Sequence, residues 1–235
     1  MKRIMLVCVA AFSLVAVADT PSAGAREWTG CWTFDGTLSD ASGYGQEAYA
    51  AQPAFTSGVE GQALRLAGAE VDIPDAPGLR LTRGFRLACR VRFASLPAGN
   101  AWATVAMKGD YAEGEYILRV DSATEGRHFS FFANTGSWEP RVSSRAPVKT
   151  GEWYQVEAGW DEKGLWLTVN GDTTRAARKG NPVLTREPLH LGAFDGELDV
   201  LRIASPGGVR TGVACWPFEG DTRDASGHGH DFAAQ

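Results

Sequence analysis

The sequence predicts an all-β protein in which two antiparallel sheets pack into a β-sandwich. Apolar and polar residues alternate with a period of two in many short runs, whereas almost no segment shows the 3.6-residue period of a helix. Residues that favour turns separate these runs at intervals of about 8–12 residues, which is typical of a sandwich. The chain of 235 residues is long enough to bury the core of one such domain.

The predicted strands follow one another along most of the chain. Residues 85–93 alternate between apolar side chains and Arg or Ala, so one face of this strand should contact a core and the other should contact water. Asn170-Gly171 predicts a hairpin, because both residues tolerate positive φ. Two short runs, 63–66 and 71–73, are expected to pair around Gly68. The remaining predicted strands are residues 28–34, 102–107, 116–120, 128–133, 153–160, 165–169, 189–193 and 198–203.

The first 25 residues have the features of a secretory signal peptide. Lys2 and Arg3 precede an apolar run, residues 4–18, and small residues at 16–18 or 23–25 offer two cleavage sites. The run is shorter than the stretch of about 20 apolar residues that a membrane-spanning helix needs. We therefore expect a mature chain that is secreted, periplasmic or at the cell surface, with no stable membrane span after cleavage. The alternative is a membrane anchor that is never cleaved.

One stretch of the sequence occurs twice, 184 residues apart (215 − 31). Residues 31–36 (CWTFDG) recur at 215–220 (CWPFEG), and residues 40–43 (DASG) recur at 224–227. This spacing is close to the length of a sandwich domain, so we expect one unit of a tandem array. The predicted domains are a signal peptide (1–25), a complete sandwich (26–204), a linker with Pro and Gly (205–212) and the truncated start of a second repeat (213–235).

The charge and the cysteines narrow the possible partners. The net charge is −5, and loss of the signal peptide, which carries two basic residues and one acidic residue (+1 in total), brings it to −6. No cluster of basic residues is interleaved with aromatics, so nucleic acid is not an expected partner. Cys89 lies on the apolar face of the run 85–93 and is predicted to be buried. Cys31 and Cys215 either form a disulfide or stay reduced, and both alternatives stay open.

Several motifs occur in a characteristic order along the chain. They are Trp32-x-Phe34-Asp35-Gly36 with Asp40-x-Ser42-Gly43, the stretch 58–64 (GVEGQAL), Gly151-Glu152-Trp153, Leu167-x-Val169-Asn170-Gly171 and Gly196-x-Leu198-Asp199. In this order they resemble the laminin-G-like domains of the concanavalin A-like lectin/glucanase superfamily, in the form common in bacterial secreted proteins. The resemblance implies a concanavalin A-like jelly roll, and its motifs do not specify a ligand.

The run Glu197-Leu198-Asp199 is similar to the catalytic strand of the glucanases that share this fold, which reads Glu-x-Asp-x-x-Glu. Retaining hydrolysis needs two carboxylates about 5–5.5 Å apart. The second Glu of that pattern is Arg202 here, so the second catalytic carboxylate is missing. The sequence also lacks a motif for a catalytic triad and a zinc-ligand spacing. We therefore expect that the chain is not an enzyme.

Related sandwiches often hold a structural calcium ion between the opening loop and the closing strand. The resemblance implies Asp40 and Asp199 as side-chain ligands and the carbonyl of Gly43 as a third. Calcium takes about six to eight oxygen ligands, which a loop rich in carboxylates and glycines can supply. In the alternative interpretation, Asp40 caps the turn at Ser42 through its own backbone, and Asp199 pairs with Arg202.

The aromatic residues provide the candidate ligand site. Trp102, Tyr111 and Trp138 lie in polar, glycine-rich stretches that are typical of loop tips. An exposed ring can stack on the C–H face of a sugar, while Asn134 and Glu139 fix its hydroxyl groups. In the alternative interpretation these side chains only cover the ends of the sandwich. Three other tryptophans, in alternating strands or at positions typical of the family, are predicted to pack in the core: Trp32, Trp153 and Trp160.

These observations lead to two main hypotheses for function. The first is a secreted, non-catalytic module that binds a glycan through the loop aromatics. The second is a structural or adhesive spacer, whose partner is an extracellular or cell-surface protein or a neighbouring module. A glycoside hydrolase is a weaker third. The motifs maintain the fold in each case, so the sequence alone does not separate the first two hypotheses.

Overall fold

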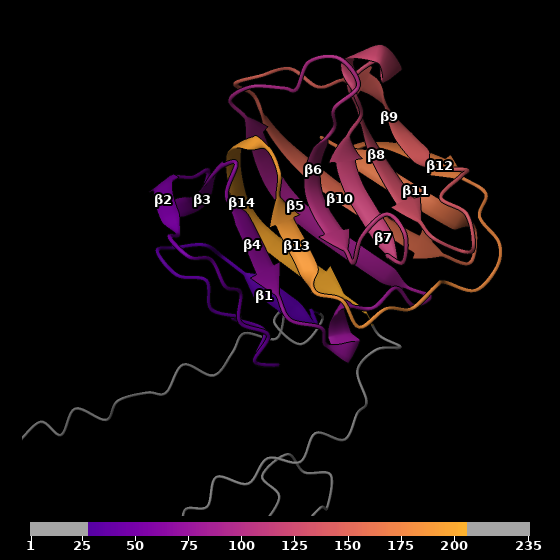
Figure 1. The fold of residues 1–235 in the computed structure, drawn as a ribbon, viewed down its shortest axis with the longest axis horizontal. Coiled ribbons are helices and arrows are strands. Elements are labelled where there is room, and N and C mark those ends of the chain that lie inside the picture. The colour runs from indigo at the N-terminus through magenta and orange to yellow at the C-terminus, as the bar shows by residue number, and fades with distance from the viewer. Residues whose placement is uncertain (1–27, 206–235) are drawn as a thin grey trace, which may run out of the picture.

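The structure is a computed structural model that describes residues 28–205. The predicted signal peptide, most of the linker and the predicted second repeat lie outside these residues, and so does Cys215. Within the described part of the chain, fourteen strands form two antiparallel sheets that pack face to face (Figure 1). No helix in this part is long and apolar enough to cross a membrane. The prediction of an all-β sandwich is confirmed.

One sheet has eight strands, with β5 near its centre. β1 (Gly30–Trp32) pairs with residues 201–203 of the last strand, so the two ends of the described chain lie together. The other strands of this sheet are, in spatial order, β12 (Asp172–Ala176), β11 (Gly164–Val169), β10 (Trp153–Asp161), β5 (Phe85–Phe93), β14 (Asp195–Ala204), β3 (Gln62–Ala67) and β2 (Ala54–Ser57).

The other sheet has six strands, with β6 and β7 at its centre. Every pairing in it is antiparallel. In spatial order its strands are β4 (Glu70–Ile73), β13 (Leu189–Gly192), β6 (Ala103–Lys108), β7 (Tyr116–Val120), β8 (His128–Ala133) and β9 (Val142–Pro147).

The core lies between the two sheets and follows from the period of two. In β5 every second residue, from Phe85 to Phe93, is buried and the residues between them are half-exposed, as the sequence predicts. Phe85 stacks against Phe131 of the opposite sheet with ring centroids 6.3 Å apart. The prediction of a buried Cys89 is confirmed, and this burial raises the pKa of its thiol to about 12. Cys31 is half-buried and makes no disulfide within the described residues.

The predicted pairing of residues 63–66 with 71–73 is wrong. These residues belong to β3 and β4, which lie in different sheets: β3 pairs with β14 and β2, whereas β4 pairs with β13. Gly68 lies between them with φ +76°, and its N–H donates to the carbonyl of Phe194 at 3.3 Å. The chain therefore crosses from one sheet to the other at Gly68 instead of forming a hairpin.

Trp153 is not a core residue, contrary to the prediction. It is half-buried on the outer face of the eight-stranded sheet, and the guanidinium of Arg92 lies 5.0 Å from its ring centroid. Because neighbouring residues of a strand face opposite sides, the burial of Tyr154 places Trp153 outside. Trp32 and Trp160 do lie in the core, as predicted.

Replacement of Trp32 with alanine should lower the free energy of unfolding by about 3–5 kcal/mol, because it empties a large site in the core. The ring is fully buried, and its Nε1 donates to the carbonyl of Gln46 at 2.8 Å. Trp153→Ala removes the same ring from the outer face and should cost less than about 1 kcal/mol. Denaturant unfolding of both variants measures the difference, and equal losses would contradict these two placements.

Candidate ligand-binding site

Three aromatic side chains, two exposed and one half-buried, meet over the outer face of the six-stranded sheet. Trp102 precedes β6, Tyr111 lies in the loop between β6 and β7, and Trp138 lies in the loop between β8 and β9. The ring centroid of Tyr111 is 5.2 Å from that of Trp102 and 6.2 Å from that of Trp138. Trp102 is 39% exposed and Tyr111 is 40% exposed. These three side chains, called the aromatic row below, are therefore adjacent in space, although the sequence separates them.

Local hydrogen bonds fix the loops that carry the row. The carboxylate of Asp110 accepts hydrogen bonds from the backbone N–H groups of Ala112 and Glu113, at 2.8 and 2.7 Å, which closes a tight turn after Tyr111. The indole Nε1 of Trp138 donates to the carbonyl of Tyr111 at 3.0 Å. This last bond joins the two loops, so the rings of the row are held relative to one another.

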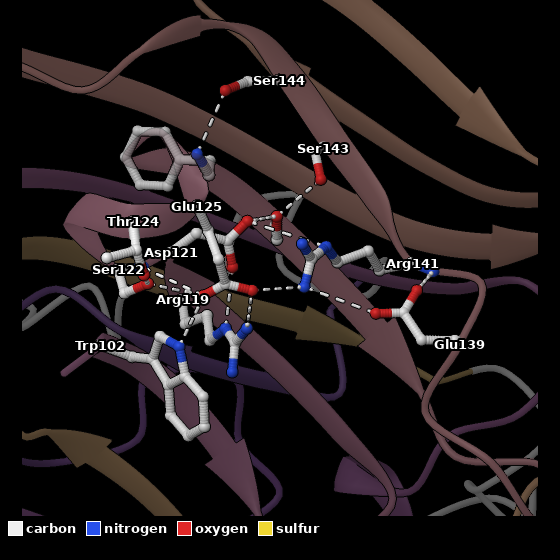
Figure 2. Close-up of polar contacts among 12 residues, drawn as sticks. Trp102, Arg119, Asp121, Ser122, Thr124, Glu125, Glu139, Arg141, Ser143 and Ser144 are labelled. Atoms are coloured by element: carbon white, nitrogen blue, oxygen red, sulfur yellow. Dashed lines mark hydrogen bonds and ion pairs between the residues drawn. The ribbon is translucent and has the colours of Figure 1, made fainter. Parts of the chain in front are cut away.

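A buried arginine packs against the row, and Figure 2 shows it beside Trp102. Arg119 of β7 is only 4% exposed, and its guanidinium lies 4.0 Å from the ring centroid of Trp102. It donates to Asp121 at 2.9 Å, to the hydroxyl of Tyr111 at 3.0 Å and to Glu125 at 3.5 Å. Each of its nitrogens thus has a partner, so Arg119 positions the rings instead of presenting a charge to a ligand.

Glu125 connects the row to the neighbouring loops (Figure 2). It ends the short 3₁₀-helix Ala123–Glu125, where it forms a capping box with Ser122. Its carboxylate accepts hydrogen bonds from Trp102 Nε1 at 2.8 Å, from Ser122 Oγ at 2.9 Å and from Arg141 at 3.0 Å. Burial opposes the charged form, but these hydrogen bonds outweigh it and lower the pKa of Glu125 to about 2.

An open pocket of about 590 Å³ lies next to the row. Three loops line it, through residues 111–113, through Asn134 with residues 136–138, and through residues 183–185. Tyr111 and Trp138 belong to its wall, whereas Trp102 lies outside it. This volume is within the range of about 300–1,000 Å³ that is usual for small-molecule sites. We call it the loop pocket.

The other two residues of the predicted ligand site are already engaged within the protein. Asn134 is buried at the loop pocket, where its amide donates to the carbonyl of Gly114 at 2.9 Å and accepts from the N–H of Gly136 at 3.0 Å. Glu139 is exposed outside the pocket lining, and its carboxylate lies 3.4 Å from Arg141. These contacts support the loops, so Asn134 and Glu139 are less available to a ligand than the rings.

Sequence reasoning missed the third wall of the loop pocket and the acid beside Tyr111. Leu184 is 57% exposed, and it lies in a segment without strand alternation. Glu113 has an exposed carboxylate at the pocket lining. An exposed leucine between Pro182 and Thr185 is a weak signal, because single exposed apolar residues are common at protein surfaces.

Asp40 does not fit the role of a calcium ligand. Its carboxylate accepts hydrogen bonds from the backbone N–H groups of Cys31, Ser42 and Gln46, at 2.9, 2.9 and 3.0 Å, and from the hydroxyl of Ser42 at 2.7 Å. Four donors therefore surround the group, as the turn-capping interpretation predicts, whereas a cation needs oxygens with free lone pairs. Gly43 lies in this capped turn with φ +87°.

Asp199 occupies a different position, under the loop of residues 58–61. Its Oδ2 accepts from the N–H groups of Val59 and Glu60 at 2.8 and 3.2 Å, and its buried Oδ1 has no hydrogen-bond partner. Burial raises the pKa of this carboxyl. The predicted pairing with Arg202 is wrong: Asp199 lies opposite Arg90 of β5, whereas the guanidinium of Arg202 lies by the ring of Trp28. No group of three or more possible metal-ligating side chains occurs within residues 28–205, so calcium stays a prediction.

The two carboxylates in the run that resembles a glucanase catalytic strand also have partners within the protein. Glu197 lies 2.9 Å from Arg92 and 3.7 Å from Arg65. Asp199 is held by backbone N–H groups, and Arg202 lies 6.0 Å from the ring centroid of Trp28. A glycosidase needs one carboxyl that can give up a proton and a second that can attack. Glu197 is instead held in ion pairs with two arginines.

Comparison with known proteins establishes the family. A laminin-G-type family profile, described as the concanavalin A-like lectin/glucanases superfamily, matches residues 67–205. The chain belongs to this superfamily. The matched residues contain the later motifs of the predicted resemblance, at 151–153, 167–171 and 196–199, and the sandwich has the predicted fold class. No curated protein matches the chain in sequence.

Solved structures with the concanavalin A-like fold include proteins of several kinds. Domain 4 of an extracellular arabinanase from Geobacillus stearothermophilus, in complex with arabinotriose, has a TM-score of 0.59 at 19% identity, with 76% of this chain and 92% of that domain covered. The binding domain of botulinum neurotoxin serotype D has a TM-score of 0.59 at 11% identity, with 77% and 48% covered. Trypanosoma rangeli sialidase has a TM-score of 0.53 at 14% identity, with 76% and 30% covered. At these identities the likeness shows the fold alone.

Acidification should leave the aromatic row intact until the pH approaches 2. The pKa of Glu125 in the folded protein, about 2, lies below its ordinary value of 4.5. The stability that its hydrogen bonds contribute is therefore complete above pH 4.5 and is lost as the pH falls toward 2. Near-ultraviolet circular dichroism of the tryptophans between pH 7 and 2 measures this change, and Glu125→Gln should abolish it. A transition centred near pH 4.5 would contradict the hydrogen bonding described for Glu125.

Replacement of Asp40 with alanine should destabilise the fold by about 2–4 kcal/mol, because four donors lose their acceptor. The melting temperature should fall equally in calcium and in EDTA, since the carboxylate acts as a cap. A loss that occurs only when calcium is present would instead restore Asp40 as an ion ligand.

Proposed function

We propose that this member of the concanavalin A-like superfamily is a secreted, non-catalytic module that binds carbohydrate through the aromatic row and the loop pocket. The observation that carries the proposal is the row itself: three partly exposed rings in contact, beside an open pocket. Isolated exposed rings are common on protein surfaces, but a contiguous set on a rigid base is typical of a binding site.

The physical fit to a sugar has two parts. The C–H groups on one face of a sugar ring are apolar and pack on an aromatic face, while its hydroxyl groups need hydrogen-bond partners at the edge. Trp102 and Tyr111 provide partly exposed rings, and the pocket adds polar groups from Glu113 and Ser137. The arabinanase domain with the same fold was solved with a bound trisaccharide, which supports this class of ligand.

We propose that the module is not catalytic because the carboxylates on its closing strand have partners within the protein. Glu197 is paired with two arginines, and Asp199 accepts hydrogen bonds from two backbone amides. Both side chains are engaged within the protein, and the strand carries Arg202 at the position where hydrolysis would need a second glutamate.

The proposal of a tandem array rests on the second copy of the opening stretch. In the described domain, Trp32 fills the core and Asp40 caps the first turn. The second copy keeps the same residue types, with Trp216 and Asp224 at the equivalent positions. It therefore carries the two side chains that open this fold.

Binding of the purified chain to an array of polysaccharides tests the proposal. We expect saturable binding to at least one glycan, and Trp138→Ala or Trp102→Ala should weaken it about five- to tenfold, or about 1–1.4 kcal/mol. Trp153→Ala is the matched control, since this ring lies on the outer face of the other sheet, and it should leave affinity unchanged. If no glycan binds, the carbohydrate proposal fails and the adhesive or spacer function takes its place.

A further inference from the structure

We propose that the loop pocket holds the terminal sugar of a neutral glycan chain, and that Glu113 selects it. This inference rests on the proposed function, because it assigns a ligand class to the same site. The pocket lies at the Tyr111–Trp138 end of the aromatic row. The buried carboxylate of Glu115 holds one of its sides, and its lining carries a single charged side chain, which is negative.

The aromatic row extends from the pocket on one side, toward Trp102. Tyr111 and Trp138 line the pocket, whereas Trp102 packs against Tyr111 outside the lining. Residues 183–185 form a further wall of this open pocket, with Leu184 exposed on it. A glycan stacked along the row from Trp102 to Tyr111 would therefore meet this wall. The pocket then holds the last sugar of the chain and not an internal one.

The wall is rigid, because one buried side chain ties it to the sheet. Glu115 is fully buried at the start of β7, and its carboxylate accepts the N–H of Thr185 at 2.7 Å and the N–H of Leu81 at 2.8 Å. The N–H of Val183 donates to the carbonyl of Asn134 at 2.9 Å, which joins the wall to the opposite loop. A preformed wall lowers the entropy cost of binding, since no loop has to be ordered by the ligand.

The charges at the pocket disfavour acidic sugars. Glu113 is the one charged side chain among the described residues that line it. Arg178 is buried beneath the loop, where two of its nitrogens donate to the carbonyls of Ser137 and Glu139, and it does not belong to the pocket lining. The carboxylate of a uronic acid, or a sulfate group, would face the like charge of Glu113 with no basic side chain in the lining, and this arrangement is costly.

Glu113 is also placed to recognise hydroxyl groups. Its backbone N–H is fixed by Asp110 at 2.7 Å, whereas its carboxylate makes no hydrogen bond or ion pair with any residue in 28–205. A carboxylate has two acceptor oxygens, and two adjacent sugar hydroxyls can donate to both of them. Such charge-assisted hydrogen bonds are stronger than neutral ones. A neutral sugar supplies the donors without the repulsion.

The experiment compares neutral with acidic glycans, using the full chain. The probes are arabinan, xylan, laminarin and inulin as neutral polymers, and polygalacturonate and alginate as acidic ones. We expect binding to at least one neutral polymer and to neither acidic one. Glu113→Gln should weaken binding about tenfold, or about 1.4 kcal/mol. Glu70→Gln, which changes an exposed acid on β4, should leave it unchanged.

A second measurement tests recognition of the chain end. Partial hydrolysis of the bound polymer creates new ends, so the amount of protein bound per gram of glycan should rise in proportion. A fall on shortening would mean that internal sugars are bound and would overturn the terminal-sugar assignment. Equal binding of acidic and neutral polymers, or full affinity in Glu113→Gln while Trp138→Ala loses affinity, would overturn the role of Glu113 and leave the proposed function intact. Absence of all glycan binding would instead remove the proposed function and this inference with it.

Discussion

Strand β7 is buried on both faces, and the candidate site follows from this constraint. Alternate residues of β7 face the core, whereas Ile117 and Arg119 point away from it and are nevertheless buried. A sheet cannot cover its own outer face, so the loops from the neighbouring strands must lie across it. The loops that carry Trp102, Tyr111 and Trp138 are among them. Burial of one central strand thereby brings together three rings that are distant in sequence.

The buried guanidinium of Arg119 determines how these loops can lie. An unpaired charge in this position would be very costly, so Asp121 and Glu125 must approach it, and the hydroxyl of Tyr111 must accept from it. Such pairs add little net stability, because the loss of hydration offsets their attraction. Their consequence is conformational: the ring of Trp102 packs on the guanidinium and donates to Glu125, which leaves it a single position.

The period-two alternation made strands such as β5 predictable, because one face of the strand packs in the core and the other is partly exposed to water. β5, β7 and β8 occur with the bounds that the sequence predicts, and the predicted hairpin at Asn170-Gly171 joins β11 to β12. The edge strands β2 and β9 were missed because they are largely exposed and carry few apolar residues. Loop composition identified the three rings. It could not identify the wall at residues 183–185, because that wall meets Tyr111 only through tertiary contacts. For Asp40 the resemblance implied a calcium ligand and the capping alternative stayed open; the donors that surround the carboxylate agree with the capping alternative.

The pairing of β1 with β14 has a mechanical consequence. The N–H of Thr29 donates to the carbonyl of Ile203 at 2.7 Å, and the N–H of Ser205 donates to the hydroxyl of Thr29 at 3.1 Å, so the chain enters and leaves the sandwich at one place. In a tandem array of such modules, each sandwich would be attached to its two linkers at a single place on its surface. The linkers would then set the length of the array, and the number of sandwiches would set its capacity for ligand. Tension along the array would open the hydrogen bonds between β1 and β14 one at a time, and the last of them would release Trp32 from the core.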